Sequence, residues 1–489
     1  MSSEHLSRRL SQLIHKHLQM MGLSKVGQSY ASRQPKNSSF GRLKYVDDNR
    51  EGPQMKVAVI GAGISGIAAA DALSDISDVT LYEAEARLGG HTDSHTVLLS
   101  DQVYSVDTGF VAFNQKEYPL FSSWLDNLGV TSLPAQMSLS VSYLPEGIEY
   151  ATTDARSLFP SLDVALSYPQ HRLLADIRRF NRTIAKAVQN HPDEPLGAFL
   201  KREKYSERFT NWHIVPLCMA QWSKAAFDVL QMPLRYVATF VDQHGLLRSD
   251  DSPQWRVIRS GATHYLEAFE RQFTGTIKLQ TPIRHVIRKD GYAEVHTDDG
   301  AVDFDAVIMA CHSDQALDVL KEPTKLETQL LGAVRYKSSR VVLHSDQSFM
   351  PNKRELWASW NAQICESGGP ATLSFWMNKI QSIRGQDFFL TLNPATTPRQ
   401  IWTERSYAHP IFDTPALEAQ ARLQEIDGTG GIFFCGSSRG WGLHEDGFSS
   451  GANAAERVVA SLANKPSLLE NDSAMSEIDA IIAAAKNRA

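Results

Sequence analysis

The chain has 489 residues, a mass of 54.4 kDa and a formal net charge of −6 at pH 7. This length exceeds that of one ordinary domain, so we expect two domains. Hydrophobic residues make up 42% of the chain and charged residues 21%, which excludes general disorder. The acidic balance excludes a nucleic-acid partner, because no basic excess is available for phosphates. Four widely separated cysteines exclude a disulfide framework and a cysteine zinc site, and we expect no bound metal.

The N-terminal segment differs from the rest in charge. Residues 1–54 carry nine Lys or Arg and four Asp or Glu, a local charge of +5, and apolar residues recur at helical spacing over 6–21. Three interpretations stay open: an amphipathic helix on a membrane surface, a mitochondrial-type targeting segment, and a poorly ordered extension, which the following polar stretch favours. Met55 is an alternative start of translation. Since no apolar run reaches the roughly 18 residues of a membrane span, we expect a cytoplasmic protein, with peripheral membrane contact as the alternative.

The first chemical motif follows a predicted buried strand at 56–60. Gly61-Ala62-Gly63-Ile64-Ser65-Gly66 opens a predicted helix through Leu73, and a second strand at 79–82 ends in Glu83. This is a GxGxxG motif in the strand–turn–helix–strand context of a dinucleotide site. Gly61 permits the tight turn, Gly63 the approach of a pyrophosphate, and Gly66 the close packing of helix on strand. Glu83 accepts hydrogen bonds from ribose hydroxyls, which disfavours NADP, and we count Ser65 among the cofactor-binding residues.

The residues after Glu83 separate FAD from NAD. Arg87, Gly89 and Gly90 continue the chain as E-x-x-x-R-x-G-G, and His91 follows. This segment resembles that of the flavin amine oxidase and phytoene desaturase superfamily. The resemblance implies that Arg87 lies beside the phosphates and that the double glycine passes close to flavin and pyrophosphate, with His91 next to it.

Other cofactor segments are implied by the same resemblance. A predicted strand at 432–435 runs into a glycine-rich turn and a small-residue helix, where Gly436 would face the pyrophosphate and Gly447 the flavin. Phe448 takes the place of a tyrosine of the aromatic cage of monoamine oxidases, which places amine oxidation in doubt. The covalent flavin cysteine has no counterpart, so we expect non-covalent FAD. Gly109 and Phe110 would pass the flavin ring, and the backbone of Val286 would contact adenine.

Catalytic and substrate residues are less well defined by sequence. His444 is a candidate catalyst, although local hydrogen bonding is the alternative, with Asp446 capping the helix. Lys379 is a candidate for the lysine that amine oxidases hold near the flavin, although a lysine facing solvent is the alternative. Trp360, Trp376 and Trp441 are candidate substrate contacts; the aromatic residues near 357–376 either line an apolar channel or fill an ordinary core.

Several segments together are more specific than the superfamily. They are residues 59–66, 107–114, 253–256, 357–361, 376–379 and 444–451. Over residues 55–462 the chain resembles the bacterial predicted NAD/FAD-binding proteins of the flavin-containing amine oxidoreductases, which often occur beside cyclopropane-fatty-acid-synthase-like methyltransferases.

The resemblance implies an α/β protein with a two-domain, amine oxidase-like fold. A Rossmann-type FAD domain (55–115, 246–325 and 426–463) would be interleaved with an α+β substrate domain (116–245 and 326–425), between an N-terminal extension (1–54) and a C-terminal tail (464–489). We expect an FAD-dependent oxidoreductase that oxidises or desaturates a hydrophobic fatty acyl or lipid-like substrate by hydride transfer to the flavin. The alternatives are a flavin amine oxidase and a non-catalytic FAD-binding accessory protein of a lipid-modifying assembly.

Overall fold

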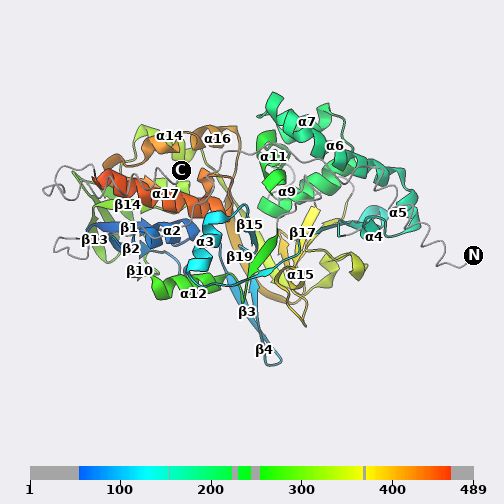
Figure 1. Ribbon diagram of the computed structural model, residues 1–489, viewed down its shortest axis with the longest axis horizontal. Coiled ribbons are helices and arrows are strands. Elements are labelled where there is room, and N and C mark those ends of the chain that lie inside the picture. Colours follow the sequence, from blue (N-terminus) through cyan, green and yellow to red (C-terminus); the bar gives the residue numbers. More distant parts are fainter. Residues whose placement is uncertain (1–53, 154, 223–228, 244–253, 367–370, 464–489) are drawn as a thin grey trace, which may run out of the picture. The chain divides into compact units, whose positions relative to one another are not determined.

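The computed structural model describes residues 54–153, 155–222, 229–243, 254–366 and 371–463. The interpretations of residues 1–53 and 464–489 therefore lie outside the described residues. The chain forms two compact units (Figure 1). The β1 unit holds the described residues of 54–135, 255–341 and 402–463, and the β7 unit holds those of 136–254 and 342–401.

A parallel five-stranded sheet forms the centre of the β1 unit, with the order β10–β2–β1–β14–β20. The strands are β1 (Lys56–Ile60), β2 (Asp78–Tyr82), β10 (Thr276–Lys278), β14 (Ala306–Met309) and β20 (Ile432–Phe434). Val57 pairs with Val79 on one side and with Ala306 on the other. The strands predicted at 56–60, 79–82 and 432–435 are confirmed as β1, β2 and β20. Their apolar runs are nearly continuous because a parallel sheet is covered on both faces.

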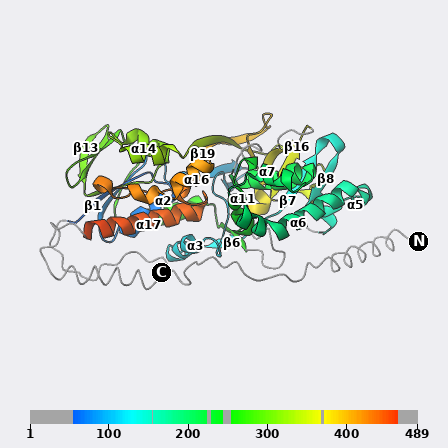
Figure 2. The same cartoon turned by 90° about the horizontal axis from the view of Figure 1, so that it is seen from above.

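Each face of this sheet has its own apolar core. Val57 and Val59 pack into a cluster with α2 (Ile64–Leu73), α3 (Pro119–Asn127), α12 (Thr263–Gln272) and α17 (His444–Ala463). Ala58 and Ile60 pack into a second cluster on the opposite face. That cluster includes residues of β11 (His285–Arg288), β12 (Ala293–Thr297), β13 (Gly300–Phe304), α13 (Ser313–Val319), α14 (Lys325–Gly332) and α16 (Thr414–Gln420). Figure 2 shows α17 lying alongside α2.

Short antiparallel elements complete the β1 unit. One is a hairpin of β3 (Ser94–Leu99) and β4 (Gln102–Asp107). The other is a small sheet in which β9 (Trp255–Ile258) pairs with β5 (Phe113–Asn114) and with β6 (Ser132–Pro134).

The β7 unit contains most of a seven-stranded sheet with the order β19–β15–β18–β17–β16–β7–β8. The strands are β7 (Leu139–Tyr143), β8 (Ile148–Ala151), β15 (Tyr336–His344), β16 (Trp360–Ile364), β17 (Ala371–Trp376), β18 (Phe389–Leu392) and β19 (Ile401–Pro410). Sequence patterns predict strands near 340–344, 371–376 and 388–392, which correspond to β15, β17 and β18, but they do not predict β7, β8, β16 and β19. The chain passes between the units within β15 and at the start of β19.

The sequence pattern predicts mainly helices over 154–245, and the described residues of this range, 155–222 and 229–243, are mainly helical. Its α-helices are α4 (Ala155–Leu158), α5 (Leu162–Leu166), α6 (Tyr168–Asn190), α7 (Leu196–Arg202), α8 (Glu207–Phe209), α9 (Val215–Trp222) and α11 (Leu234–Gln243), and α15 (Met377–Gln381) follows β17. Within the described part of the chain, no helix has both the length and the hydropathy needed to cross a membrane.

The observed boundaries between the units differ from the expected domain boundaries. Residues 116–135 were assigned to the substrate domain but belong to the β1 unit. The reason is that α3 buries Phe121 and Trp124 in the core beside α2, and β6 pairs with β9. Residues 326–341 and 402–425 belong to the β1 unit as well, since α14 buries Leu330 in its second core.

A row of hydrogen-bonded polar side chains crosses the centre of the β7 unit's sheet. Ser140, Asn361, Ser374, Thr391 and His344 lie on β7, β16, β17, β18 and β15, and each is at most 1% exposed. Ser140 Oγ donates to Asn361 Oδ1 at 2.8 Å, Ser374 and Thr391 hydroxyls are 2.6 Å apart, and Thr391 Oγ1 lies 2.7 Å from His344 Nε2. Because a register shift would leave these groups buried without partners, the row fixes the strand pairing.

We expect Asn361→Ala to destabilise the β7 unit by about 2–3 kcal/mol, because it removes the acceptor of Ser140 and the donor to the Ala358 carbonyl at 2.7 Å. Urea unfolding followed by fluorescence measures the change. Gln363→Ala on the same strand is the control: its amide donates to Ser348 in a solvent-exposed hydrogen bond, so its effect stays below about 1 kcal/mol. Equal destabilisation by the two variants would contradict a structural role for the buried row.

Candidate functional site

The turn between β1 and α2 has two glycines whose place is dictated by the protein itself. Gly61 has a φ of +103°, and a Cβ there would lie 2.9 Å from the carbonyl oxygen of Ala310. A Cβ on Gly66 would lie 1.8 Å from the carbonyl oxygen of Gly61. Both residues therefore permit the helix to start directly against the sheet, as the sequence predicted.

Gly63 differs from these two. Its backbone is extended at φ −73° and ψ 177°, and a Cβ there would meet no described protein atom within 4 Å. Gly63 is the N-cap of α2 and, as a glycine, has no side chain that could cap the helix. The first-turn N–H groups and the positive end of the helix dipole thus form an anion site, which fits a pyrophosphate.

Glu83 is held at the end of β2 beside this turn. Its Oε2 accepts a hydrogen bond from the N–H of Ala62 at 2.8 Å, and its Oε1 accepts one from the N–H of Glu85 at 2.9 Å. A carboxylate has about four acceptor positions, so acceptors remain for ribose hydroxyls. The position of Glu83 fits the predicted role.

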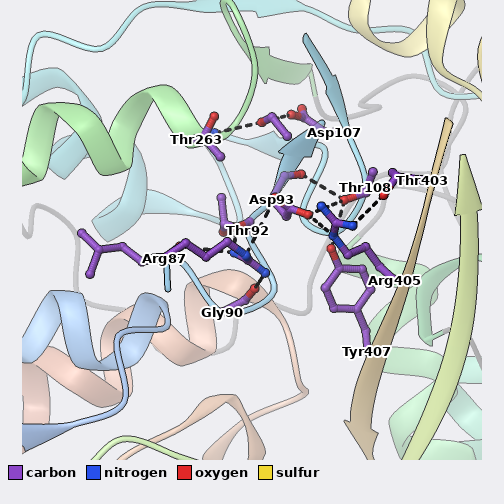
Figure 3. Close-up of polar contacts among 12 residues, drawn as sticks. Arg87, Gly90, Thr92, Asp93, Asp107, Thr108, Thr263, Thr403, Arg405 and Tyr407 are labelled. Carbon is purple, nitrogen blue, oxygen red and sulfur yellow. Dashed lines mark hydrogen bonds and ion pairs between the residues drawn. The ribbon is translucent and has the colours of Figure 1, made fainter. Parts of the chain in front are cut away.

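The double glycine lies against Gly63. Gly89 donates its N–H to the carbonyl of Ala62 at 2.8 Å, and a Cβ on Gly90 would lie 3.2 Å from Gly63 Cα. Arg87, predicted beside the phosphates, donates to three carbonyls of its own loop, those of Leu88, Gly90 and Thr92 (Figure 3). The contacts observed for Arg87 therefore shape the loop that presents the double glycine.

His91 connects this loop to Gly109 and Phe110. The carbonyl of His91 accepts the N–H of Phe110 at 2.9 Å, and a Cβ on Gly109 would lie 1.8 Å from that carbonyl oxygen. The glycine at 109 is thus required by contact with His91. His91 Nε2 donates to the carbonyl of Ala408 at 3.0 Å, and burial together with neighbouring histidines lowers the pKa of His91 to about 3.

His444 is the first residue of α17 and stacks on Phe110. The two rings are 3.7 Å apart with an interplanar angle of 10°. His444 Nε2 lies 3.2 Å from the hydroxyl of Tyr265, which is 2.6 Å from Thr92 Oγ1. Burial, and to a smaller extent His91, lowers the pKa of His444 to about 3. The imidazole is therefore neutral at pH 7 and a weak proton acceptor.

The placement of Phe448 in an aromatic cage is corrected by the structure. Phe448 is 0% exposed and packs in the core, with ring centroids 5.2 Å from Trp124 and 6.1 Å from Phe121. Since α17 begins at His444, residue 448 lies one turn inside the helix on the side that faces α3. Its missing hydroxyl therefore carries no information about the substrate.

The two acids after His444 accept hydrogen bonds from backbone N–H groups. Glu445 accepts from the N–H groups of Leu120 and Phe121 at 2.9 and 3.0 Å and so caps α3, a role that the sequence did not show. Asp446 accepts from the N–H groups of Trp441 and Leu443 and closes the loop before α17. Burial raises the pKa of Glu445 to about 7 and that of Asp446 to about 6.

The remaining predicted cofactor residues all lie in the β1 unit. Ser65 is buried against α17, where a Cβ on Gly447 would lie 3.1 Å from Ser65 Oγ. The N–H of Gly436 donates to Ser450 Oγ at 3.1 Å. Val286 is 1% exposed on β11, and its carbonyl accepts the N–H of Lys321 at 3.1 Å.

The candidate substrate tryptophans and Lys379 have local structural roles. Trp376 packs edge-on against Trp357 at 5.3 Å and donates its indole N–H to Asp387 at 3.0 Å. Trp360 is 7% exposed on β16, and Lys379 Nζ donates to the carbonyl of Trp357 at 3.2 Å. These four residues lie in the β7 unit, where Trp357 and Trp376 form a small core with Phe389, and so the core interpretation holds. Trp441 belongs to the loop closed by Asp446.

A polar network that the sequence analysis missed supports the loops around His91 (Figure 3). Arg405 Nε contacts Asp93 Oδ2 at 2.5 Å, and Thr108 Oγ1 lies 3.1 Å from the same oxygen and 3.0 Å from the hydroxyl of Tyr407. Asp107 accepts from Ser94 Oγ at 2.6 Å and from the N–H of Ala262 at 2.8 Å. Burial raises the pKa of Asp107 to about 7. The signal in the sequence was the acid directly before Thr108-Gly109.

Comparison with known proteins adds to this geometry. The family model described as flavin containing amine oxidoreductase matches residues 64–371. The chain belongs to this family. Tryptophan 2-monooxygenase of Rhizobium rhizogenes is 36% identical over 109 residues, which are 21% of this chain and 14% of that protein. The enzyme of the same name from Agrobacterium tumefaciens (strain Ach5) is 33% identical over 118 residues, 23% of this chain and 15% of that protein. The chain thus matches only a small part of these relatives.

Solved structures share the fold at low identity. Cyclohexylamine oxidase from Brevibacterium oxydans IH-35A has a TM-score of 0.62 and 17% identity, covering 84% of this chain and 100% of that one. A putative protoporphyrinogen oxidase from Exiguobacterium sp. 255-15 has a TM-score of 0.62 and 16% identity, covering 83% and 99%. The α/β, amine oxidase-like fold expected from sequence is thereby confirmed.

Members of this family carry a flavin, and the residues of the chain fit FAD. The N-terminus of α2 and the open side of Gly63 fit the pyrophosphate, and Glu83 fits the ribose. Bound FAD would supply hydride-accepting chemistry at this site. The protein's own groups orient the cofactor through backbone N–H groups and hold Phe110 and an uncharged His444 together.

We expect Gly63→Ala to weaken FAD binding at least about tenfold while the FAD-free protein keeps its thermal stability, because the added methyl meets no protein atom but lies at the anion site. FAD released by acid precipitation and differential scanning fluorimetry measure the two effects. Gly66→Ala is the matched control: its methyl clashes with Gly61, so the FAD-free protein itself loses about 1–3 kcal/mol. Full FAD occupancy in the Gly63 variant would contradict the assignment.

We predict that the buried carboxyl of Asp107 makes the stability of the protein depend on pH. The pKa of its carboxyl is raised from about 3.9 in the unfolded chain to about 7 by burial, so its contribution to stability is full below about pH 4 and lost as pH rises through 7. Asp107→Asn keeps an acceptor for Ser94 and Ala262 but cannot ionise. Between about pH 4 and about pH 8, wild type should lose about 2–4 kcal/mol more than this variant in urea unfolding. Parallel pH profiles would show that Asp107 does not titrate in this range.

Proposed function

We propose that the protein oxidises or desaturates a hydrophobic, fatty acyl or lipid-like substrate. The observation that carries the proposal is the stacked Phe110–His444 pair next to the dinucleotide turn, in which the imidazole is kept uncharged. Such a pair offers apolar surface and a weak hydrogen-bonding group. It suits a substrate that has no charge at the reacting carbon.

The neighbouring groups support the same substrate class. His91 is neutral as well, and the carboxylates of Glu445 and Asp446 are both occupied by backbone N–H groups. The two acids hold backbone segments in place, and the two imidazoles add no charge. A long acyl chain instead gains affinity from its tail, since burial of each methylene contributes roughly 0.8 kcal/mol.

The fold is compatible with fatty acid chemistry. A solved structure described as a CLA-producing fatty acid isomerase from P. acnes has a TM-score of 0.59 and 15% identity, covering 82% of this chain and 98% of that one. At this identity the likeness concerns the fold alone. The resemblance to bacterial proteins that occur beside fatty-acid-modifying methyltransferases points to the same substrate class.

The second candidate function is amine oxidation. It is favoured by the family to which the chain belongs and by the partial likeness to tryptophan 2-monooxygenase. In that case a neutral amine would lie against Phe110. A non-catalytic accessory role, the third alternative, predicts bound FAD that no substrate reduces.

We expect phospholipids with unsaturated or branched acyl chains to bleach the flavin absorbance under anaerobic conditions, and small primary amines and tryptophan to leave it unchanged. Phe110→Leu keeps an apolar side chain and should retain the lipid response, whereas Phe110→Asp places a charge beside the acyl chain and should slow it at least about tenfold. Stopped-flow absorbance at matched FAD content measures both. Rapid bleaching by an amine with no response to lipids would establish the second candidate. Flavin absorbance that no compound changes would establish the third.

A further inference from the structure

The outer face of α6 in the β7 unit has a composition that the cofactor site does not explain. This helix runs for 23 residues, Tyr168–Asn190. Leu173, Phe180 and Ile184 are at most 1% exposed and define its buried face. The opposite face carries side chains that reach solvent.

Positive charge is concentrated on this helix. It contains five Arg or Lys residues and one acid, Asp176, a net +4 in a chain whose net charge is −6. Asp176 is 2% exposed and lies on the inner side, paired with Arg172 and Arg179 and accepting the N–H of Ser206. The acid therefore does not neutralise the outer face.

Three basic residues follow one another at four-residue spacing on that outer face, namely Arg178, Arg182 and Lys186. Burial and, after it, the charge of Arg182 lower the pKa of Arg178. Like charges one turn apart destabilise an isolated helix.

Two exposed apolar side chains stand at the N-terminal end of the same helix. Leu166, the last residue of α5, is 80% exposed, and Tyr168, the first residue of α6, is 75% exposed. Among the large hydrophobic side chains of the described residues, these two have the highest exposed fractions. Single exposed apolar residues are common, but here an aliphatic and an aromatic side chain adjoin a basic helix face.

We propose that Leu166, Tyr168, Arg178, Arg182 and Lys186 form a docking face for an anionic lipid bilayer. Basic side chains are attracted to the negative surface potential of acidic lipids, and aliphatic and tyrosine side chains enter the interfacial region. An acidic protein would match the charge, but it would not explain the exposed Leu166 and Tyr168. The inference does not depend on the identity of the substrate.

The test is sedimentation of the full-length, FAD-loaded protein with phosphatidylcholine vesicles, with and without phosphatidylglycerol. We expect binding only to the anionic vesicles, and weaker binding as salt increases. Replacing Arg178, Arg182 and Lys186 by Gln together should lower the affinity about 100-fold. The pair Leu166→Ser and Tyr168→Ser should lower it about tenfold, with the salt dependence retained.

A matched triple variant in the β1 unit, Arg271→Gln with Lys321→Gln and Lys325→Gln, removes the same charge from exposed positions and should bind as wild type does. FAD content and melting temperature verify that each variant is folded. Equal loss in the matched variant would show that only net charge matters and would overturn the proposal. So would undiminished binding of the α6 variant, or absence of wild-type binding to anionic vesicles, in which case an acidic protein becomes the partner to seek.

Discussion

The β1 unit depends on direct contact between backbones at the start of α2. Gly61 packs against the carbonyl of Ala310, Gly66 packs against the carbonyl of Gly61, and Gly90 packs against Gly63 Cα. On the outer side, a Cβ on Gly451 of α17 would lie 2.0 Å from the carbonyl oxygen of Ser65. Helix, sheet and loop thus approach one another at distances that only glycine permits. The same geometry presents the N–H groups of α2 as an anion site, so stability and cofactor binding share one set of residues.

The second organising feature is that several polar groups around this turn hydrogen-bond to the protein's own backbone, and that two imidazoles there are uncharged. Arg87 donates to carbonyls of its own loop, Glu445 caps α3, and His91 donates to the carbonyl of Ala408. Burial keeps the imidazoles of His91 and His444 neutral. A site built in this way orients a cofactor by hydrogen bonds and offers little fixed charge to a substrate, which is the physical basis of the proposed preference for apolar substrates.

Some motif residues turned out to have a role other than the one expected. Phe448 was aligned with an aromatic cage position, but the start of α17 at His444 turns it into the core beside Trp124. Trp376 was a candidate substrate contact for which a core position was the alternative, and it donates to Asp387 and packs on Trp357. In both cases the sequence shows an aromatic residue in a plausible segment. Which side of a helix or strand faces a core is decided by the neighbouring elements.

The resemblance of the motifs to a flavoprotein family indicated the cofactor class. The sequence by itself determined the GxGxxG turn with its acid, the strands of the β1 unit's central sheet and the helical pattern over 154–245. These follow from local rules, namely glycine spacing, apolar runs and helical periodicity, that act over a few residues. Only the tertiary structure decided that 116–135 join the β1 unit, that Glu445 caps a helix 325 residues away, and that a polar row crosses five strands of the other sheet. Such contacts join residues far apart in the chain. Their energies depend on burial and on partners that no local pattern encodes.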